Sequence, residues 1–177
     1  MSDETRLCLF ESDLGWFALV GCGAAVSRLT FAHRSALAAL QSVAGGDLAE
    51  AGSRDPLQKL ARRLQAYARG KADDFCDVPL FFATQTKFQQ RVTDACRRIA
   101  PGKVLSYAEL ATRVGSPGAA RAVGNCMARN PIAIIVPCHR VLASGGGLGG
   151  YSMGSGLDVK RRLLRLEGYE IDALQAT

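Results

Sequence analysis

Residues 106–141 read SYAELATRVGSPGAARAVGNCMARNPIAIIVPCHRV, and this stretch decides how the second half of the chain folds. Ser106 and Glu109 have the spacing of a capping box, which predicts a helix that ends at Gly115. Ser116 and the proline after it are expected to start a second helix after a very short turn. Two short helices joined through a glycine are typical of a helix-turn-helix.

The second of these helices, in residues 118–130, is built mainly from glycine and alanine around Arg121. Small side chains let a helix approach a nucleic-acid backbone or groove closely, with Arg121 projecting from it. The same composition also suits tight packing of one helix on another, which would leave Arg121 merely solvated. Both interpretations remain open at this point.

The segment IAIIV, residues 132–136, is short, apolar and β-branched, which predicts a strand buried on both faces, although a helical segment has the same composition. Pro137 ends it, and Cys138 and His139 follow. A cysteine in this setting is commonly a small buried hydrophobic residue. Here an imidazole and then Arg140 come next in the chain, and both lower the pKa of a nearby thiol, so the sequence favours a reactive thiolate.

Adjacent residues of a strand point to opposite faces, so Cys138 and His139 can cooperate only if the chain turns after Pro137. Downstream, residues 142–156 hold seven glycines among fifteen residues, which suits either the lining of a pocket or a flexible surface loop. Residues 157–168 predict a helix with Glu167 in its last turn, where a carboxylate opposes the helix dipole. Glu167 is therefore either an exposed side chain or the partner that fixes the tautomer of His139.

Composition limits the class of protein. The chain is 48% hydrophobic and 21% charged, as expected for a folded globular protein. No apolar stretch is long enough to span a membrane, and the six scattered cysteines indicate a reduced, cytoplasmic protein. The cysteines lack metal-site spacing and there are two histidines, so no metal site is expected.

Charge is distributed unevenly along the chain. Residues 1–84 carry nine basic and ten acidic residues, a net charge of −1, and residues 85–177 carry thirteen and six, a net charge of +7. A basic half suggests a polyanionic partner such as nucleic acid, or a solvated basic surface.

We expect two domains, residues 1–84 and 85–177, in an α/β (α+β) fold. The first would hold a small antiparallel sheet with helices, ribonuclease H-like, and the second would be mostly helical with the helix-turn-helix and a short sheet.

The motifs RAVGNCMARNPIAIIVPCHRV, GYS and LLRLEG together make residues 85–168 similar to the O6-alkylguanine-DNA alkyltransferases. This resemblance implies that Cys138 accepts an alkyl group and that His139, oriented by Glu167, activates it through a water. Tyr107 matches a phenol that rotates the target nucleotide and hydrogen-bonds the guanine. Asn130 matches a residue that ties the helix-turn-helix to the active-site loop.

The resemblance also implies the DNA contacts. Arg121 matches a finger that fills the gap left by a flipped nucleotide, with its helix in the minor groove. Two serines match contacts to the DNA backbone, Ser116 and Ser144. In the base pocket, the Val141 carbonyl and the Ser152 N–H match contacts to the base, and Tyr151 matches a wall of the pocket.

The implied function is direct reversal of DNA damage: one irreversible alkyl transfer from O6-alkylguanine in duplex DNA, by a monomer that can bind cooperatively, without a cofactor. Some family members hold a structural zinc, but here Cys22 alone matches a ligand, so no zinc is expected. The segment YSMGSGL is two residues longer than the family form, which bears on the size of lesion accepted. The alternatives are a non-catalytic lesion binder, against which Cys138 argues, and a cysteine hydrolase, which leaves the helix-turn-helix unexplained.

Overall fold

The computed structural model describes residues 5–45 and 48–171. The chain divides into two compact units. Unit 1 comprises residues 1–82 and 131–133, and unit 2 comprises residues 83–130 and 134–177. The boundary expected after residue 84 thus lies just inside unit 2. Within the described part of the chain, no helix has the length and apolar character needed to cross a membrane.

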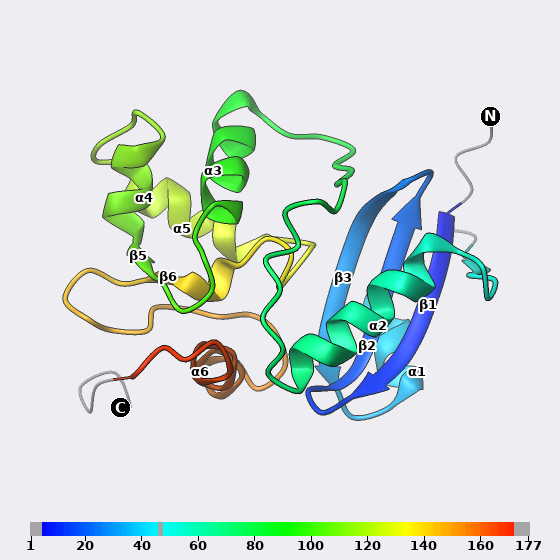
Figure 1. Cartoon of the computed structure of the whole chain (residues 1–177). Coiled ribbons are helices and arrows are strands. Elements are labelled where there is room, and N and C mark those ends of the chain that lie inside the picture. Colours follow the sequence, from blue (N-terminus) through cyan, green and yellow to red (C-terminus); the bar gives the residue numbers. More distant parts are fainter. Residues whose placement is uncertain (1–4, 46–47, 172–177) are drawn as a thin grey trace. The chain divides into compact units, whose positions relative to one another are not determined.

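Unit 1 is built on a sheet of order β3-β2-β1-β4 (Figure 1). Its strands are β1 (Thr5–Ser12), β2 (Gly15–Cys22), β3 (Ala25–His33) and β4 (Ala49–Glu50). The first three pair antiparallel, as the sequence predicts, but β4 runs parallel to β1. The sheet is therefore mixed and not purely antiparallel.

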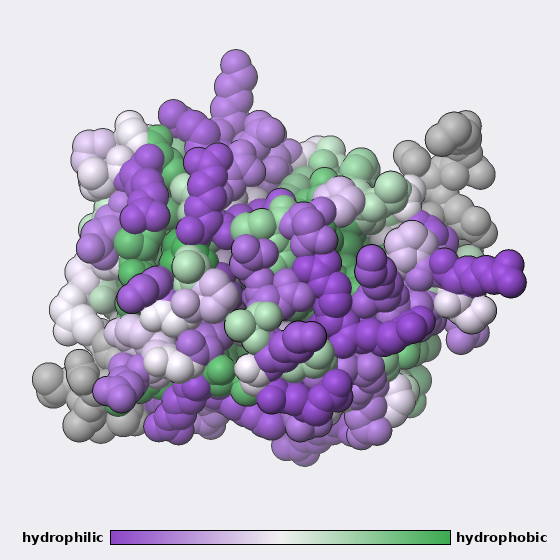
Figure 2. All heavy atoms as spheres, in the orientation of Figure 1, coloured by the Kyte–Doolittle hydropathy of each residue, from purple (hydrophilic) through white to green (hydrophobic). Residues whose placement is uncertain are grey.

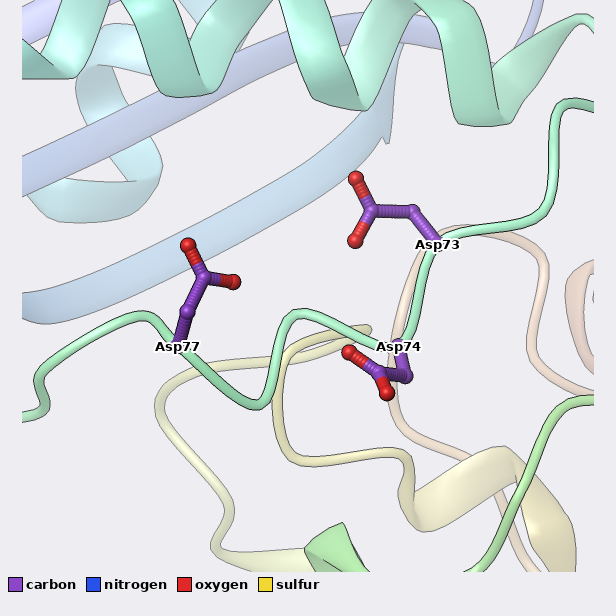
Figure 3. Close-up of side chains that lie close together, drawn as sticks. All are labelled: Asp73, Asp74 and Asp77. Atoms are coloured by element: carbon purple, nitrogen blue, oxygen red, sulfur yellow. The ribbon is translucent and has the colours of Figure 1, made fainter.

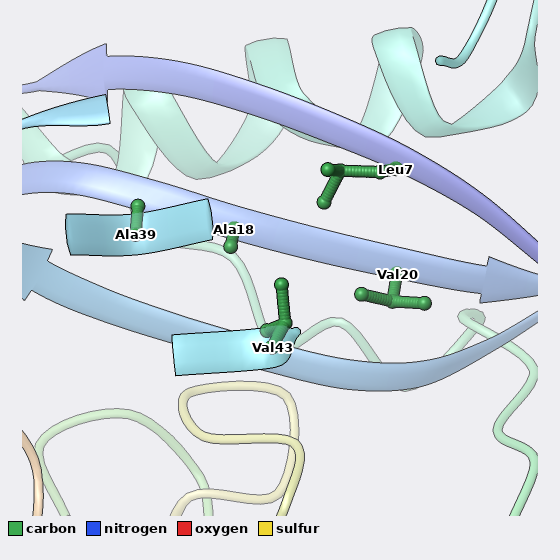
Figure 4. Packing of buried hydrophobic residues seen from close by; sticks show 5 residues of the cluster. All are labelled: Leu7, Ala18, Val20, Ala39 and Val43. Atoms are coloured by element: carbon green, nitrogen blue, oxygen red, sulfur yellow. The ribbon is translucent and has the colours of Figure 1, made fainter. Parts of the chain in front are cut away.

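Two helices cover opposite faces of this sheet, α1 (Ala36–Val43) and α2 (Pro56–Ala68). Side chains alternate between the faces of a strand, so Ala18 and Val20 pack with α1, as Figure 4 shows. Gly21 faces the other way and lies against Leu57 of α2. Asp55 caps the N-terminus of α2, since its carboxylate accepts the Leu57 backbone N–H at 2.9 Å.

Unit 2 is mostly helical, with a short parallel pair of strands. Its elements in chain order are α3 (Lys87–Arg97), β5 (Leu105–Ser106), α4 (Tyr107–Arg113), α5 (Ala120–Ala128), the 3-10 helix η1 (Cys138–Arg140), β6 (Val141–Leu142) and α6 (Leu157–Leu166). The capping box expected before α4 is formed by Ser106 with Glu109, and Thr86 with Gln89 forms another before α3.

Helices α4 and α5 form the predicted helix-turn-helix, but α5 begins later than expected. The prediction places its start at Ser116, whereas the first helical residue is Ala120. Gly115 and Gly118 have φ of 72° and 90°, in the left-handed region that a right-handed helix excludes. The turn therefore extends to Ala119, which caps α5 without a side-chain hydrogen bond.

The prediction of a strand at residues 132–136 is wrong. These residues are buried as expected, but they form a turn flanked by isolated bridges. Ile132 bridges to Leu29, and the Leu29 N–H and carbonyl bond to Pro131 and Ala133. Ile134 then adopts φ of 69°, which is unusual for a β-branched residue and breaks the extended run. Apolar composition predicted the burial correctly but not the backbone shape.

Candidate active site

Cys138 opens η1 directly after Pro137 and is 7% exposed. The chain does turn there, because the Arg140 N–H bonds to the Pro137 carbonyl at 2.9 Å. Asn130, which follows α5, donates from Nδ2 to the Val136 carbonyl at 2.8 Å and to the Cys138 Sγ at 3.2 Å. Asn130 thus connects the end of the helix-turn-helix to the thiol.

His139 is fully buried, and its Nε2 lies 2.9 Å from the Glu167 Oε1. A carboxylate accepts hydrogen bonds, so Nε2 carries the proton in the neutral imidazole and Nδ1 carries the lone pair. Nδ1 is buried and has no hydrogen-bond partner among the described residues. The structure thus leaves one ring nitrogen of His139 able to take a proton.

The same carboxylate binds Arg140. Arg140 Nε donates to Glu167 Oε2 at 2.9 Å, and Nη2 donates to Oε1 at 2.8 Å. A third donor, Nη1, reaches the Ile99 carbonyl at 2.5 Å. All three groups of the guanidinium face protein acceptors, so Arg140 makes a structural salt bridge. Its alternative role as a direct stabiliser of the thiolate is not supported.

Burial dominates the electrostatics of this site. It raises the pKa of the Cys138 thiol, against the lowering effects of the Asn130 hydrogen bond and the Lys160 charge. Burial also lowers the pKa of His139, although Glu167 acts in the opposite direction. Burial alone would raise the pKa of Glu167, but hydrogen bonds from His139 and Arg140 hold it well below its usual range. At neutral pH the resting site therefore holds a thiol, a neutral imidazole and a carboxylate.

Lys160 is a site residue that the sequence reasoning missed. It is fully buried in α6, and its Nζ donates to the Val141 carbonyl at 2.6 Å and to the Leu148 carbonyl at 2.5 Å. Burial lowers its pKa to about 8, while Cys138 and Cys96 act to raise it. Lys160 thus braces two segments that follow the cysteine and places positive charge near its thiol.

Cys138 opens into a pocket of about 620 Å³ in unit 2. The predicted residues that line it with Cys138 are Tyr107, Arg121, Ser144, Tyr151 and Ser152. Further lining residues that the sequence reasoning did not assign to the pocket include Asn125, Met127, Ala128 and Gly150. Tyr107 rests against Gly149, where an added Cβ would come within 2.9 Å of the phenol ring and hydroxyl. Burial raises the pKa of Tyr107, so its hydroxyl remains a proton donor.

Other predicted site residues do not line this pocket. Asn130 donates to the Cys138 thiol, and Glu167 bonds to His139, which follows Cys138 in the chain. Val141 is buried, and its carbonyl already accepts the Lys160 ammonium. Ser116 lies in the turn of the helix-turn-helix, where its carbonyl accepts the Ala119 N–H.

Three carboxylates in unit 1 lie within 4.8 Å of one another, on Asp73, Asp74 and Asp77 (Figure 3). Two of them are already paired with one arginine, which offsets one of their two charges. Arg63 contacts both oxygens of Asp73, at 2.9 and 2.8 Å, and both oxygens of Asp77, at 2.7 Å each. The cluster is a salt-bridge network that fixes this loop, and its donor set does not favour a metal ion.

The fold and site define a protein whose Cys138 thiol, backed by an imidazole and a carboxylate, opens into a pocket beside a helix-turn-helix. Residues 87–169 match the family described as the DNA-binding domain of 6-O-methylguanine DNA methyltransferase. The methylated-DNA--protein-cysteine methyltransferase of Mycobacterium leprae is 40% identical over 161 residues, 91% of each chain. The protein of that name from Methanosarcina acetivorans is 48% identical over 111 residues, 63% of this chain and 69% of its own.

Solved structures agree with the sequence relatives. OGT of Mycobacterium tuberculosis in complex with DNA is 38% identical, with a TM-score of 0.73 over 93% of this chain and 92% of its own. The O6-methylguanine methyltransferase of the same organism is 34% identical, with a TM-score of 0.75 over 98% and 99%. The chain belongs to the methylated-DNA--protein-cysteine methyltransferase family.

Proposed function

We propose that the protein repairs duplex DNA by moving the alkyl group of O6-alkylguanine onto its own Cys138. The Sγ–carbon bond forms as the carbon–O6 bond breaks, the thiol proton passes to His139, and guanine takes up a proton at the ring. The product, S-alkylcysteine, is a thioether without an easy leaving group. Each molecule therefore reacts once.

The observation that carries this proposal is the thiol–imidazole–carboxylate arrangement beside the pocket. Asn130 holds Sγ from one side, and the free Nδ1 of His139 accepts the thiol proton through a water. Glu167 stabilises the imidazolium that forms. Tyr107 keeps its proton at neutral pH and donates it toward the guanine ring as negative charge develops on O6 and spreads into the ring.

The DNA-bound state follows from the chemistry. O6 cannot be reached inside a base pair, so the nucleotide must flip out, which costs a few kcal/mol and less for a mispaired lesion. The small residues of α5 suit close approach to the minor groove, and Arg121 is exposed on that helix. The bound unit is a monomer, Ser116 and Ser144 contact the backbone, and Tyr151 and Ser152 wall the base.

The test is incubation with duplex DNA that carries O6-methylguanine, followed by peptide mass spectrometry. We expect one methyl group on the Cys138 peptide, at no more than one per protein, and none in the Cys138→Ser variant. A non-catalytic lesion binder would leave the peptide unmodified, and a hydrolase would turn over repeatedly. Either outcome would contradict the proposal.

Arg121→Ala should weaken repair of duplex DNA far more than reaction with a free O6-alkylguanine base. The Arg121 side chain can fill a gap only where a flipped nucleotide has left the base stack, and a free base provides no such gap. Single-turnover rates on both substrates would measure the difference. Equal losses on the two would refute the finger role.

A further inference from the structure

A second hollow in unit 2, of about 260 Å³, lies between α3 and α4 and does not share a residue with the active-site pocket. Three arginines line it, Arg91 and Arg98 from α3 and its C-cap and Arg113 from the last turn of α4, together with Asp94. Three positive charges against one negative leave an excess of two. Figure 2 shows long hydrophilic side chains standing over this part of the molecule.

These arginines form no salt bridge to a carboxylate, unlike several others in the described part of the chain. Arg6, Arg63 and Arg140 each bind carboxylates of the protein. In residues 5–45 and 48–171, no carboxylate lies within 4.0 Å of the guanidinium groups that line the hollow, and all three side chains are exposed. Glu109, one turn before Arg113, is engaged in the capping box, and it interacts with the Arg113 charge without forming a salt bridge. The three guanidinium groups therefore have free donors, and such donors bind phosphate well.

The hollow lies at the end of α4, the first helix of the helix-turn-helix. Helix α4 carries Tyr107 of the pocket at its first residue and Arg113 of the hollow at its last. Six residue steps span about 9 Å along a helix, so the hollow and the pocket lie at opposite ends of α4. In a helix-turn-helix, the first helix crosses the backbone while the second enters the groove.

We infer that this hollow, the α3–α4 arginine site, binds a backbone phosphate of the same duplex that α5 engages. The inference rests on the proposed function, which supplies the duplex. The site would add affinity without reading sequence, since phosphate contacts position a protein and base contacts specify. It would extend the DNA footprint beyond Arg121 and the pocket.

The test measures duplex binding by fluorescence anisotropy over a series of salt concentrations. One phosphate contact contributes about 0.9 to the slope of log K against log salt. The variant with Arg91→Gln, Arg98→Gln and Arg113→Gln together should therefore lower this slope by about one. Each of the three single variants should weaken binding. Their losses should sum to more than the loss in the triple variant, because the three arginines share one phosphate.

Arg165→Gln is the matched control, because Arg165 is also exposed in the last turn of a helix of unit 2. Like Arg113→Gln, it removes one positive charge and one favourable contact with a helix C-terminus. A loss of affinity for Arg113→Gln no larger than that of this control would overturn the inference. Thermal unfolding checks the fold, and the single variants provide the same comparison if the triple variant is unstable.

Neutral methylphosphonates placed one at a time along the duplex would locate the contact. We expect one position that weakens binding of the wild type and has no effect on the triple variant. No such position would contradict the α3–α4 arginine site but leave alkyl transfer intact. Failure to bind or repair DNA at all would instead contradict the proposed function.

Discussion

Glu167→Gln should slow alkyl transfer by about a hundredfold or more, the usual range for loss of acid–base catalysis. The carboxylate accepts three hydrogen bonds, one from His139 and two from Arg140. An amide in its place sets a donor against a donor in either orientation, and it has no negative charge to stabilise the imidazolium. Single-turnover transfer from a free O6-alkylguanine base measures this effect without any contribution from DNA binding.

The same substitution should lower the free energy of unfolding by about 3–5 kcal/mol, because it leaves the Arg140 guanidinium charged and buried without its counterion. The side chains of Glu167 and Arg140 are only 2% and 1% exposed, so solvent cannot compensate. Asp55→Asn is the control, since Asp55 is also buried and pairs with Arg6 at 2.5 Å, but in unit 1. It should destabilise the protein and leave the transfer rate unchanged. Equal transfer rates for the two variants would contradict the role of Glu167.

Local sequence rules predicted the helices of the fold well. The caps at Asp55, Thr86 and Ser106 depend on residues within three positions of one another, and all three form. The errors are non-local. Strand β4 is two residues long and exists only by pairing with β1. Residues 132–136 have strand composition and bridge to β3 at Leu29, but the positive φ of Ile134 ends the extended run after one bridge.

The site residues were predictable where reactive side chains lie close together in the sequence. Cys138 and His139 are adjacent, and the resemblance to a known family supplied Tyr107 and Arg121. Lys160 was missed because a lysine within a run of basic residues belongs to no recognisable motif. Its spacing did hold a signal, since Lys160, Leu164 and Glu167 follow one another at four and then three positions and share one helix face. A lysine on the stripe that carries a buried carboxylate is expected to be buried too.

Lys160→Met should reduce alkyl transfer at neutral pH by about tenfold for each unit by which the pKa of the Cys138 thiol rises. The buried ammonium lowers that pKa, so removing its charge raises it further. The rising limb of the rate–pH profile should therefore move to higher pH, and high pH should restore much of the rate. A loss of rate that is the same at every pH would show that Lys160 acts only as a brace for the Val141 and Leu148 carbonyls.

Stability gives a second, independent signature of Lys160. Its pKa is about 8 in the folded protein against an ordinary value of 10.5, so between these values the unfolded chain binds more protons. The free energy of unfolding should therefore rise as pH increases from 8 to 10.5. Lys160→Met should abolish that rise, whereas Lys103→Met, which removes an exposed lysine of the same unit, should retain it. Denaturant unfolding across this pH range measures the difference, and identical pH dependence in the two variants would mean that the Lys160 ammonium titrates as a solvated group.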